Sequence, residues 1–123
     1  MSDQRRNVRY QTLAKASIKE ANEGEILLKD ISILGCRVEC TTKTGIEKNS
    51  RYRLDVIPEN ASKIGSFDLL VETKWIRTGS YACEIGFLIV ESPRRKLFQR
   101  YVDYLSWRSS QDGSAGFDTG ISG

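Results

Sequence analysis

The stretch Asp30-Ile31-Ser32-Ile33-Leu34-Gly35 lies between two segments that resemble β-strands, residues 25–29 before it and residues 36–41 after it. Aspartate and serine side chains hydrogen-bond to nearby backbone groups, and glycine tolerates positive φ angles, so the stretch suits a tight polar turn. A D-x-S-x-x-G hexamer also occurs often by chance. By itself it does not separate a turn from a ligand site.

Working outward from this turn, apolar and polar residues alternate in several short segments, the pattern of half-buried strands. The strongest alternation runs from Tyr81 to Ile89. The candidate strands are residues 14–20, 25–31, 36–41, 51–56, 66–75 and 81–89. Strands at about ten-residue spacing, joined by turns, predict a small antiparallel barrel or sandwich.

The periodicity changes at Ser92-Pro93, which suits a helix N-cap followed by proline at the first helical position. One apolar face follows at helical spacing, made of Leu97, Phe98, Tyr101, Val102 and Leu105. We expect this face to dock on an open end of the barrel. Serines and glycines dominate residues 109–123 and predict a disordered tail. The expected organisation is a flexible arm at 1–12, a barrel with its helix at 13–108, and the tail.

Composition fits one globular domain, with 123 residues, 39% hydrophobic and 28% charged, and a net charge of +3. No apolar run reaches the length of a membrane span and no signal region begins the chain, so we expect a cytoplasmic protein. The three cysteines, Cys36, Cys40 and Cys83, fall at apolar positions and are expected to be buried thiols.

The sequence has no histidine, no C-x-x-C pair and no glycine-rich phosphate loop. Zinc sites and Ser/His or Cys/His nucleophile pairs are therefore poorly supported. We expect no enzyme activity, no metal and no cofactor.

A second motif lies near the start of the chain, where Arg5 and Arg9 form an R-x-x-x-R pattern with Arg6 between them. Together with D-x-S-x-x-G, this pattern resembles the PilZ domain family, which binds the bacterial second messenger cyclic di-GMP. Residues 75–77 (W-x-R) and Gly86-Phe87 resemble further family positions, and the resemblance covers about residues 4–107. It implies a mainly β fold, a six-stranded antiparallel split barrel with a C-terminal amphipathic helix.

By resemblance, the set that binds cyclic di-GMP is Arg5, Arg9, Asp30, Ser32 and Gly35. The ligand would be one molecule or an intercalated dimer. The residue types suit that ligand, because arginine forks match phosphate and the guanine Hoogsteen edge, while a carboxylate accepts from guanine donors.

Three further residues have two interpretations each. Arg6 either holds a second ligand molecule or is solvated. Trp75 shares the apolar phase of the preceding strand, so it is either a core or rim residue or a stacking platform for guanine. Arg77 follows in the same phase and could reach a phosphate.

The resemblance predicts a cyclic di-GMP receptor that signals to an unidentified protein partner, in motility, exopolysaccharide export or virulence. One alternative is a PilZ-like protein–protein adaptor that does not bind nucleotide. Another is a small barrel that binds RNA or single-stranded DNA. Such modules stack bases on exposed aromatics, whereas most aromatics here fall in the apolar phase, so no nucleic acid polymer is expected as a partner.

Overall fold

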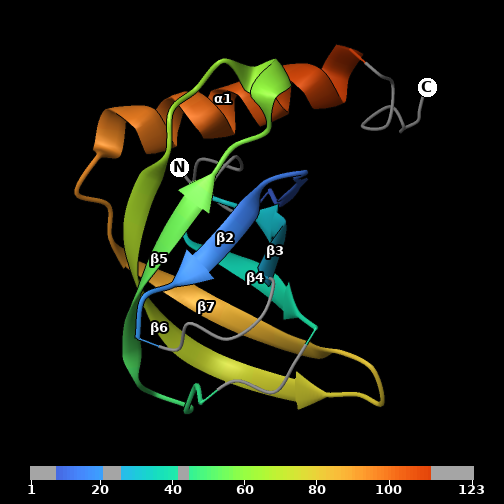
Figure 1. Ribbon diagram of the computed structural model, residues 1–123. Coiled ribbons are helices and arrows are strands. Elements are labelled where there is room, and N and C mark those ends of the chain that lie inside the picture. Colours follow the sequence, from blue (N-terminus) through green and yellow to red (C-terminus); the bar gives the residue numbers. More distant parts are fainter. Residues whose placement is uncertain (1–7, 21–25, 42–44, 112–123) are drawn as a thin grey trace.

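The computed structural model describes residues 8–20, 26–41 and 45–111, and the predictions for Arg5, Arg6 and residues 112–123 lie outside them. The described residues form seven strands, a short 3₁₀ helix and one α-helix (Figure 1). In chain order these are β1 (Tyr10–Gln11), β2 (Lys15–Ile18), β3 (Ile26–Ile31), β4 (Gly35–Cys40), β5 (Arg51–Ile57), η2 (Asn60–Ser62), β6 (Phe67–Thr78), β7 (Cys83–Glu91) and α1 (Arg95–Gln111).

The described strands close into an antiparallel barrel. They pair in the order β3-β2-β5-β6-β7-β4, and β4 pairs back to β3, so six strands form the closed sheet. Strand β1 is a seventh strand outside the closed sheet. It pairs with β3 at Ile31 and Asp30, on the same edge of β3 that pairs with β2 at Leu27 and Ile26. The predicted six-stranded antiparallel barrel with a C-terminal helix is confirmed.

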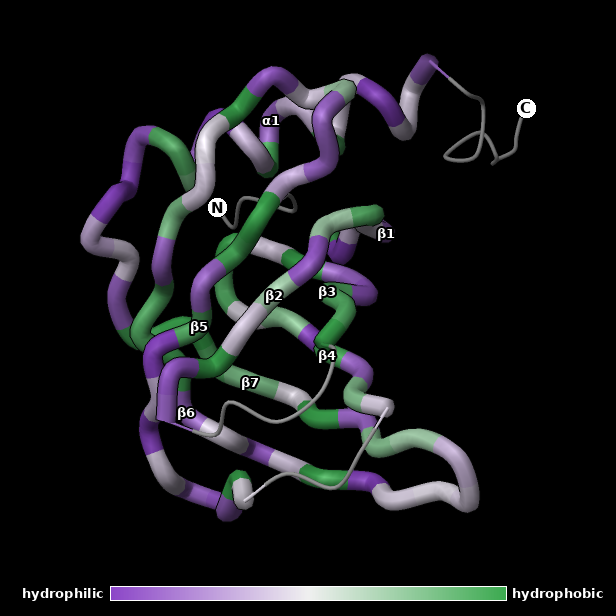
Figure 2. The backbone as a smooth tube through the Cα atoms, in the orientation of Figure 1, coloured by the Kyte–Doolittle hydropathy of each residue, from purple (hydrophilic) through white to green (hydrophobic). Residues whose placement is uncertain are grey.

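Hydrophobic residues recur along the strands (Figure 2), and those that alternate into the barrel interior are buried. Ile18, Leu28, Val38, Leu54 and Leu69 are all at 1% exposure or less, one from each of five strands. The interior is mostly apolar, with the fully buried Thr73 as an exception, and a chain of this size can bury such a core without disulfide or metal support.

The three cysteines are free and buried, as predicted. Burial in the apolar interior raises the pKa of the Cys36 thiol to about 12 and that of Cys40 to about 11, because a thiolate there would lose its hydration. The thiols therefore stay neutral and serve as core side chains.

Helix α1 covers one end of the barrel through the predicted apolar face (Figure 1). Phe98, Tyr101, Val102 and Leu105 are buried, and the Phe67 ring lies 5.9 Å from the rings of both Phe98 and Tyr101. The face read from helical spacing is thus the one that packs on the barrel.

The predicted ends of this helix were wrong by two or three residues. The first helical hydrogen bond runs from the Phe98 N–H to the Arg94 carbonyl, so the helix begins at Arg95, after a turn at residues 93–94. At the other end the helix includes residues 109–111, which were expected in the tail. Serine and glutamine at 109–111 do not stop a helix whose preceding turn is anchored.

Residues 10–12 were expected in the flexible arm, and this expectation was wrong. Tyr10 and Gln11 form β1, and the Thr12 N–H donates to the Lys29 carbonyl at 3.1 Å. The buried Thr12 hydroxyl also donates to the Leu28 carbonyl at 2.6 Å. These contacts with β3 fix the chain immediately after Arg9.

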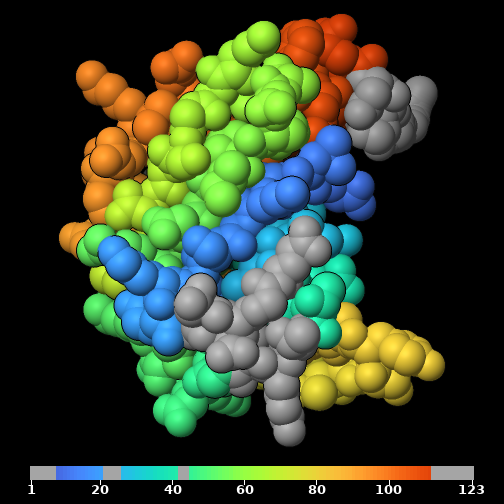
Figure 3. Space-filling model, in the orientation of Figure 1, coloured from blue at the N-terminus to red at the C-terminus, as the bar shows by residue number. Residues whose placement is uncertain are grey.

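The β6–β7 hairpin also differs from its prediction, since β6 continues to Thr78 and β7 begins at Cys83. It projects from the body of the molecule (Figure 3). Tyr81, assigned to the strand by its phase, lies in the connecting turn with 92% of its surface exposed. No helix in the described ranges is long and apolar enough to cross a membrane.

Candidate functional site

A pocket of about 390 Å³ lies where the chain before β1 meets the β3–β4 turn and strands β6 and β7. Four of the predicted site residues line it, namely Arg9, Asp30, Gly35 and Trp75. The other lining residues are Leu34, Cys36, Arg37, Lys74, Gly86, Phe87 and Leu88. The fold therefore brings the end of the R-x-x-x-R motif against the D-x-S-x-x-G motif.

A larger groove of about 770 Å³ lies along α1, between the helix and residues of β1, the β3–β4 turn and the end of β7. Its lining includes Tyr10 and Ile33, which are the chain neighbours of the pocket residues Arg9 and Leu34. None of the predicted site residues that the structure describes lines this groove. We take the smaller pocket as the candidate site, because charged and polar groups converge there.

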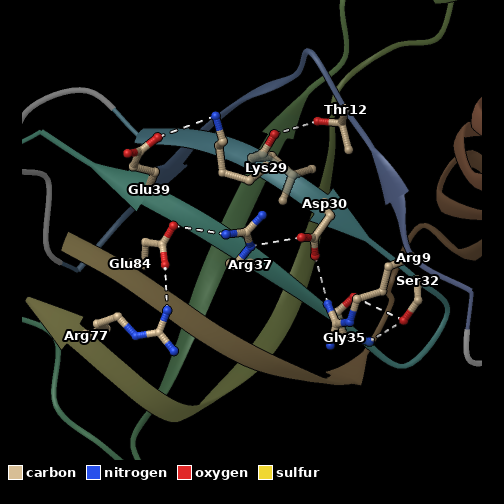
Figure 4. A network of polar contacts seen from close by, with 11 residues as sticks. Arg9, Thr12, Lys29, Asp30, Ser32, Gly35, Arg37, Glu39, Arg77 and Glu84 are labelled. Carbon is tan, nitrogen blue, oxygen red and sulfur yellow. Dashed lines mark hydrogen bonds and ion pairs between the residues drawn. The ribbon is translucent and has the colours of Figure 1, made fainter. Parts of the chain in front are cut away.

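Asp30 is the centre of the site (Figure 4). Its carboxylate accepts a hydrogen bond from Arg9 Nη1 at 2.9 Å on one oxygen and from Arg37 Nε at 2.8 Å on the other. The Asp30 side chain is 13% exposed, against 50% for Arg9 and 32% for Arg37. A carboxylate held between two guanidinium groups fixes the direction in which both arginines present their remaining donors.

Arg37 continues the network toward the β6–β7 hairpin. Its Nη1 donates to Glu84 at 2.9 Å, and Arg77 Nη1 donates to the other Glu84 oxygen at 3.4 Å (Figure 4). The hydrogen bond to Asp30 is the main cause that raises the pKa of Arg37, so this guanidinium stays charged.

Sequence reasoning missed Arg37. The signal that could have found it is strand register, because Arg37 in β4 is the direct partner of Asp30 in β3. Opposite charges at paired positions on neighbouring strands attract.

Ser32 shapes the turn that carries the motif. Its hydroxyl accepts from the N–H groups of Leu34 and Gly35, both at 3.2 Å, and donates to the Gly35 carbonyl at 3.3 Å. The residue is 3% exposed and is not among the residues that line the pocket. In this structure the serine acts on the backbone between Asp30 and Gly35.

Gly35 is required by a close approach of backbone. A Cβ atom there would lie 2.6 Å from the Phe87 carbonyl oxygen and 3.4 Å from Arg9 Nη2. The φ angle of Gly35 is not in the left-handed region. A side chain is excluded by the close contact with the backbone of β7. A larger residue would push on β7 and on the arginine together.

Trp75 leaves the barrel interior because β6 has an irregularity between Thr73 and Trp75. Thr73 is fully buried, whereas Trp75 is 37% exposed and its indole lies on Gly86, where a Cβ would be 2.2 Å from the ring. The tryptophan is thus a wall of the pocket. Bulges re-aim side chains in this way.

The predicted site residue Arg77 lies beyond the pocket. Its guanidinium carbon is 5.3 Å from the centroid of the Trp75 ring, and its side chain is 74% exposed. Among the described lining residues, Arg9, Arg37 and Lys74 outnumber the acidic Asp30. The described lining residues therefore carry more positive than negative charge, which favours an anionic ligand.

No family model matches the sequence, and no curated protein matches it. Solved structures do match. The Bacillus subtilis inhibitor of motility (MotI/DgrA) superposes with a TM-score of 0.69 at 18% identity, over 85% of this chain and 50% of that one. The chain thus spans about half the length of that protein.

Two structures from Escherichia coli match as well. The PilZ domain of YcgR with c-di-GMP has a TM-score of 0.64 at 17% identity, over 88% of this chain and 95% of that one. YcgR in complex with c-di-GMP has a TM-score of 0.59 at 14% identity, over 91% and 49%. The resemblance to the PilZ family is thereby supported at the level of the fold: the chain has a PilZ-like fold.

Proposed function

We propose that this domain is a receptor for cyclic di-GMP. The observation that carries the proposal is the convergence of Arg9, Asp30 and Gly35 on one pocket with Trp75 in its wall. Arg9, the Asp30–Gly35 motif and Trp75 lie far apart in the sequence, and the resemblance of the two motifs to the PilZ family implies this ligand. The YcgR PilZ domain, which has the same fold, was solved with c-di-GMP.

The pocket offers complementary groups for such a ligand. Arg9 is half exposed and has further N–H groups beyond the one that meets Asp30, so it can fork onto a phosphate or a guanine edge. Asp30 can accept from the guanine N1 and N2 donors by sharing or exchanging its arginine partners. A guanine stacked on the Trp75 indole would contribute ~1–3 kcal/mol.

In this proposal Arg5 and Arg6 complete the site from the arm, and Ser32 supports it through the turn. Arg77 contributes through its contact with Trp75. Whether one molecule or an intercalated dimer binds depends on how far these arginines extend the pocket. A metal or cofactor is not needed for this recognition.

The proposed output is a contact with a protein partner, since a receptor without catalysis must act through another molecule. One structural match is an inhibitor of motility, which makes a motility partner the first to test. Exopolysaccharide export and virulence stay open as pathways, and a cytoplasmic location follows from the proposed ligand.

Calorimetric titration with cyclic di-GMP tests the proposal, with GTP and cyclic di-AMP as controls. Arg9→Ala should weaken binding by ~2 kcal/mol or more, about thirtyfold, as for a charge-assisted bond. Arg53→Ala is a matched control, because Arg53 is similarly exposed at 55% and pairs with Asp68 at 3.7 Å, outside the pocket.

Arg9→Ala should leave the melting temperature nearly unchanged, since exposed ion pairs contribute little to stability. Absence of heat with wild-type protein at high micromolar cyclic di-GMP would reject the receptor. In that case the alternative, a PilZ-like adaptor that binds a protein and no nucleotide, becomes the better account.

A further inference from the structure

The C-terminal half of α1 is tied to the chain segment that carries Arg9. Arg108 Nη1 donates to Glu59 Oε2 at 2.8 Å, and Arg108 Nη2 donates to the backbone carbonyl of Gln11. The other Glu59 oxygen accepts from the Tyr101 hydroxyl at 2.7 Å. One guanidinium therefore bridges the helix, the β5–β6 connection and β1.

The Arg108–Glu59 pair is partly shielded from water, whereas the bond from Arg108 to the Gln11 carbonyl is exposed. The side chain of Arg108 is 26% exposed and that of Glu59 only 12%. The Tyr104 ring adds a face-on contact, with its centroid 5.9 Å from the Arg108 guanidinium carbon. A charge pair that is partly desolvated and bonded at several atoms holds its geometry better than a solvated surface pair.

The carbonyl that Arg108 holds belongs to a position next to the pocket. Gln11 is two residues after Arg9, and in the β1–β3 ladder its direct partner is Asp30. Strand β1 is two residues long. So short a ladder has little stability of its own, and an outside contact has a large share in fixing it.

Resting on the proposed function, we propose that Arg108, oriented by Glu59, is a positioning residue for the cyclic di-GMP pocket. Its bond to the Gln11 carbonyl keeps β1 against β3, and this places the Arg9 guanidinium where it meets Asp30. Arg108 and Glu59 are not among the described residues that line the pocket, so they act through β1 and not through the ligand.

This arrangement couples α1 to the ligand site. A ligand that binds Arg9 and Asp30 together favours the state in which β1 is seated, and the Arg108 bond favours the same state. Coupling of this kind is reciprocal, and its usual size is about 5- to 150-fold in affinity.

The first test uses hydrogen exchange on the full-length protein without ligand. Arg108→Ala should speed exchange of the backbone amides of residues 10–12, while amides of the barrel core, such as that of Leu69, stay protected. Arg100→Ala is the matched control, a basic residue exposed on the same helix, and should change neither. Unchanged exchange in residues 10–12 of Arg108→Ala would overturn the proposal, as would a general loss of protection across the barrel.

The second test is a double-mutant cycle for cyclic di-GMP binding. Arg108→Ala should weaken binding about tenfold in the wild-type background and less than twofold when Arg9→Ala is already present, because the group that it positions is gone. Equal losses in both backgrounds would show that Arg108 does not act through Arg9. Arg108→Lys should bind more tightly than Arg108→Ala, because the ammonium can still pair with Glu59. It should bind more weakly than wild type, because an ammonium cannot bridge Glu59 and Gln11 as the guanidinium fork does.

The two tests separate the two proposals. If wild-type protein binds no cyclic di-GMP, the receptor fails, and the exchange data alone decide whether Arg108 seats β1. If wild-type binds and Arg108→Ala binds equally well, the receptor stands and the positioning role is wrong.

Discussion

Replacing Asp30 with asparagine should weaken both the fold and the proposed ligand site. The carboxylate holds Arg9 at 2.9 Å and Arg37 at 2.8 Å, and asparagine would keep one acceptor oxygen but turn an NH₂ group toward a guanidinium donor. The Arg37 bond counts most for stability, because both of its partners are mostly buried. The half-exposed Arg9 pair contributes less.

From these contacts we expect Asp30→Asn to lower the free energy of unfolding by about 1–2 kcal/mol. For a domain of this size the melting temperature should fall by about 4–8 °C. Affinity for cyclic di-GMP should fall about tenfold or more, because Arg9 and Arg37 lose the group that orients them and a guanine loses an acceptor. Asp30→Ala, with neither acceptor, should bind more weakly still.

Asp68→Asn is the matched control. The Asp68 side chain is 18% exposed and also faces two arginines, Arg53 and Arg94, but both at 3.7 Å and away from the pocket. Its replacement should cost about 0.5 kcal/mol or less and leave affinity unchanged. Urea melts and calorimetry measure the two quantities. Equal stability losses in the two variants would refute the argument from close geometry, and full affinity in folded Asp30→Ala would show that the motif has been misread.

Three further substitutions test other features. Gly86→Ala should displace the Trp75 indole, which a Cβ would meet at 2.2 Å, so affinity should fall about fivefold or more. The melting temperature should fall as well, because overpacking costs stability. Unchanged affinity in the folded variant would remove Trp75 from the site. Thr73→Val should raise the free energy of unfolding by about 1 kcal/mol in urea melts, because the buried hydroxyl has no hydrogen-bond partner among the described residues. A lower free energy of unfolding would show that the hydroxyl does have a partner. Cys36 should affect stability at alkaline pH, because burial raises the pKa of its thiol from 9.0 to about 12. The contribution of the neutral thiol to the free energy of unfolding is therefore complete below pH 9 and is lost as the pH rises from 9 to 12. Cys36→Ala should therefore flatten the decline in urea midpoint across that range, and an equally steep decline would contradict the pKa shift.

The barrel and its helix could be predicted because their signals are local and repeated. Cys36, Val38 and Cys40 alternate with polar residues in β4, and each is buried in the interior. The helix face repeats at helical spacing, and tertiary packing uses that face.

Strand β1 could not be predicted, because two residues carry no periodicity. Its place depends on Thr12 contacts with β3 and on Arg108, whose position is 97 residues away from Gln11 in the chain. The strand irregularity before Trp75 could not be predicted either. The alternation of apolar residues continues through Trp75 in the sequence, and the register shift is set by the pairing of β6 with β7.

The candidate site divides in the same way. Arg9 and Asp30 were found through motif spacing, and the structure brings them into contact. Ser32 has the local role that its residue type suggests in a turn. Arg37 and the support from Glu59 and Arg108 depend on register and on long-range packing, which a single sequence does not display.

The different surroundings of the two tryptophans give this domain an intrinsic optical reporter. Trp75 forms a wall of the pocket, whereas Trp107 lies near the end of α1, 58% exposed, with its nearest aromatic neighbour Tyr104 at 6.2 Å. Replacing Trp107 with phenylalanine would leave one indole emitter, in the wall of the pocket. Under the proposed function, emission from that single residue would follow occupancy of the pocket in unlabelled protein, so cyclic di-GMP levels could be measured by fluorescence alone.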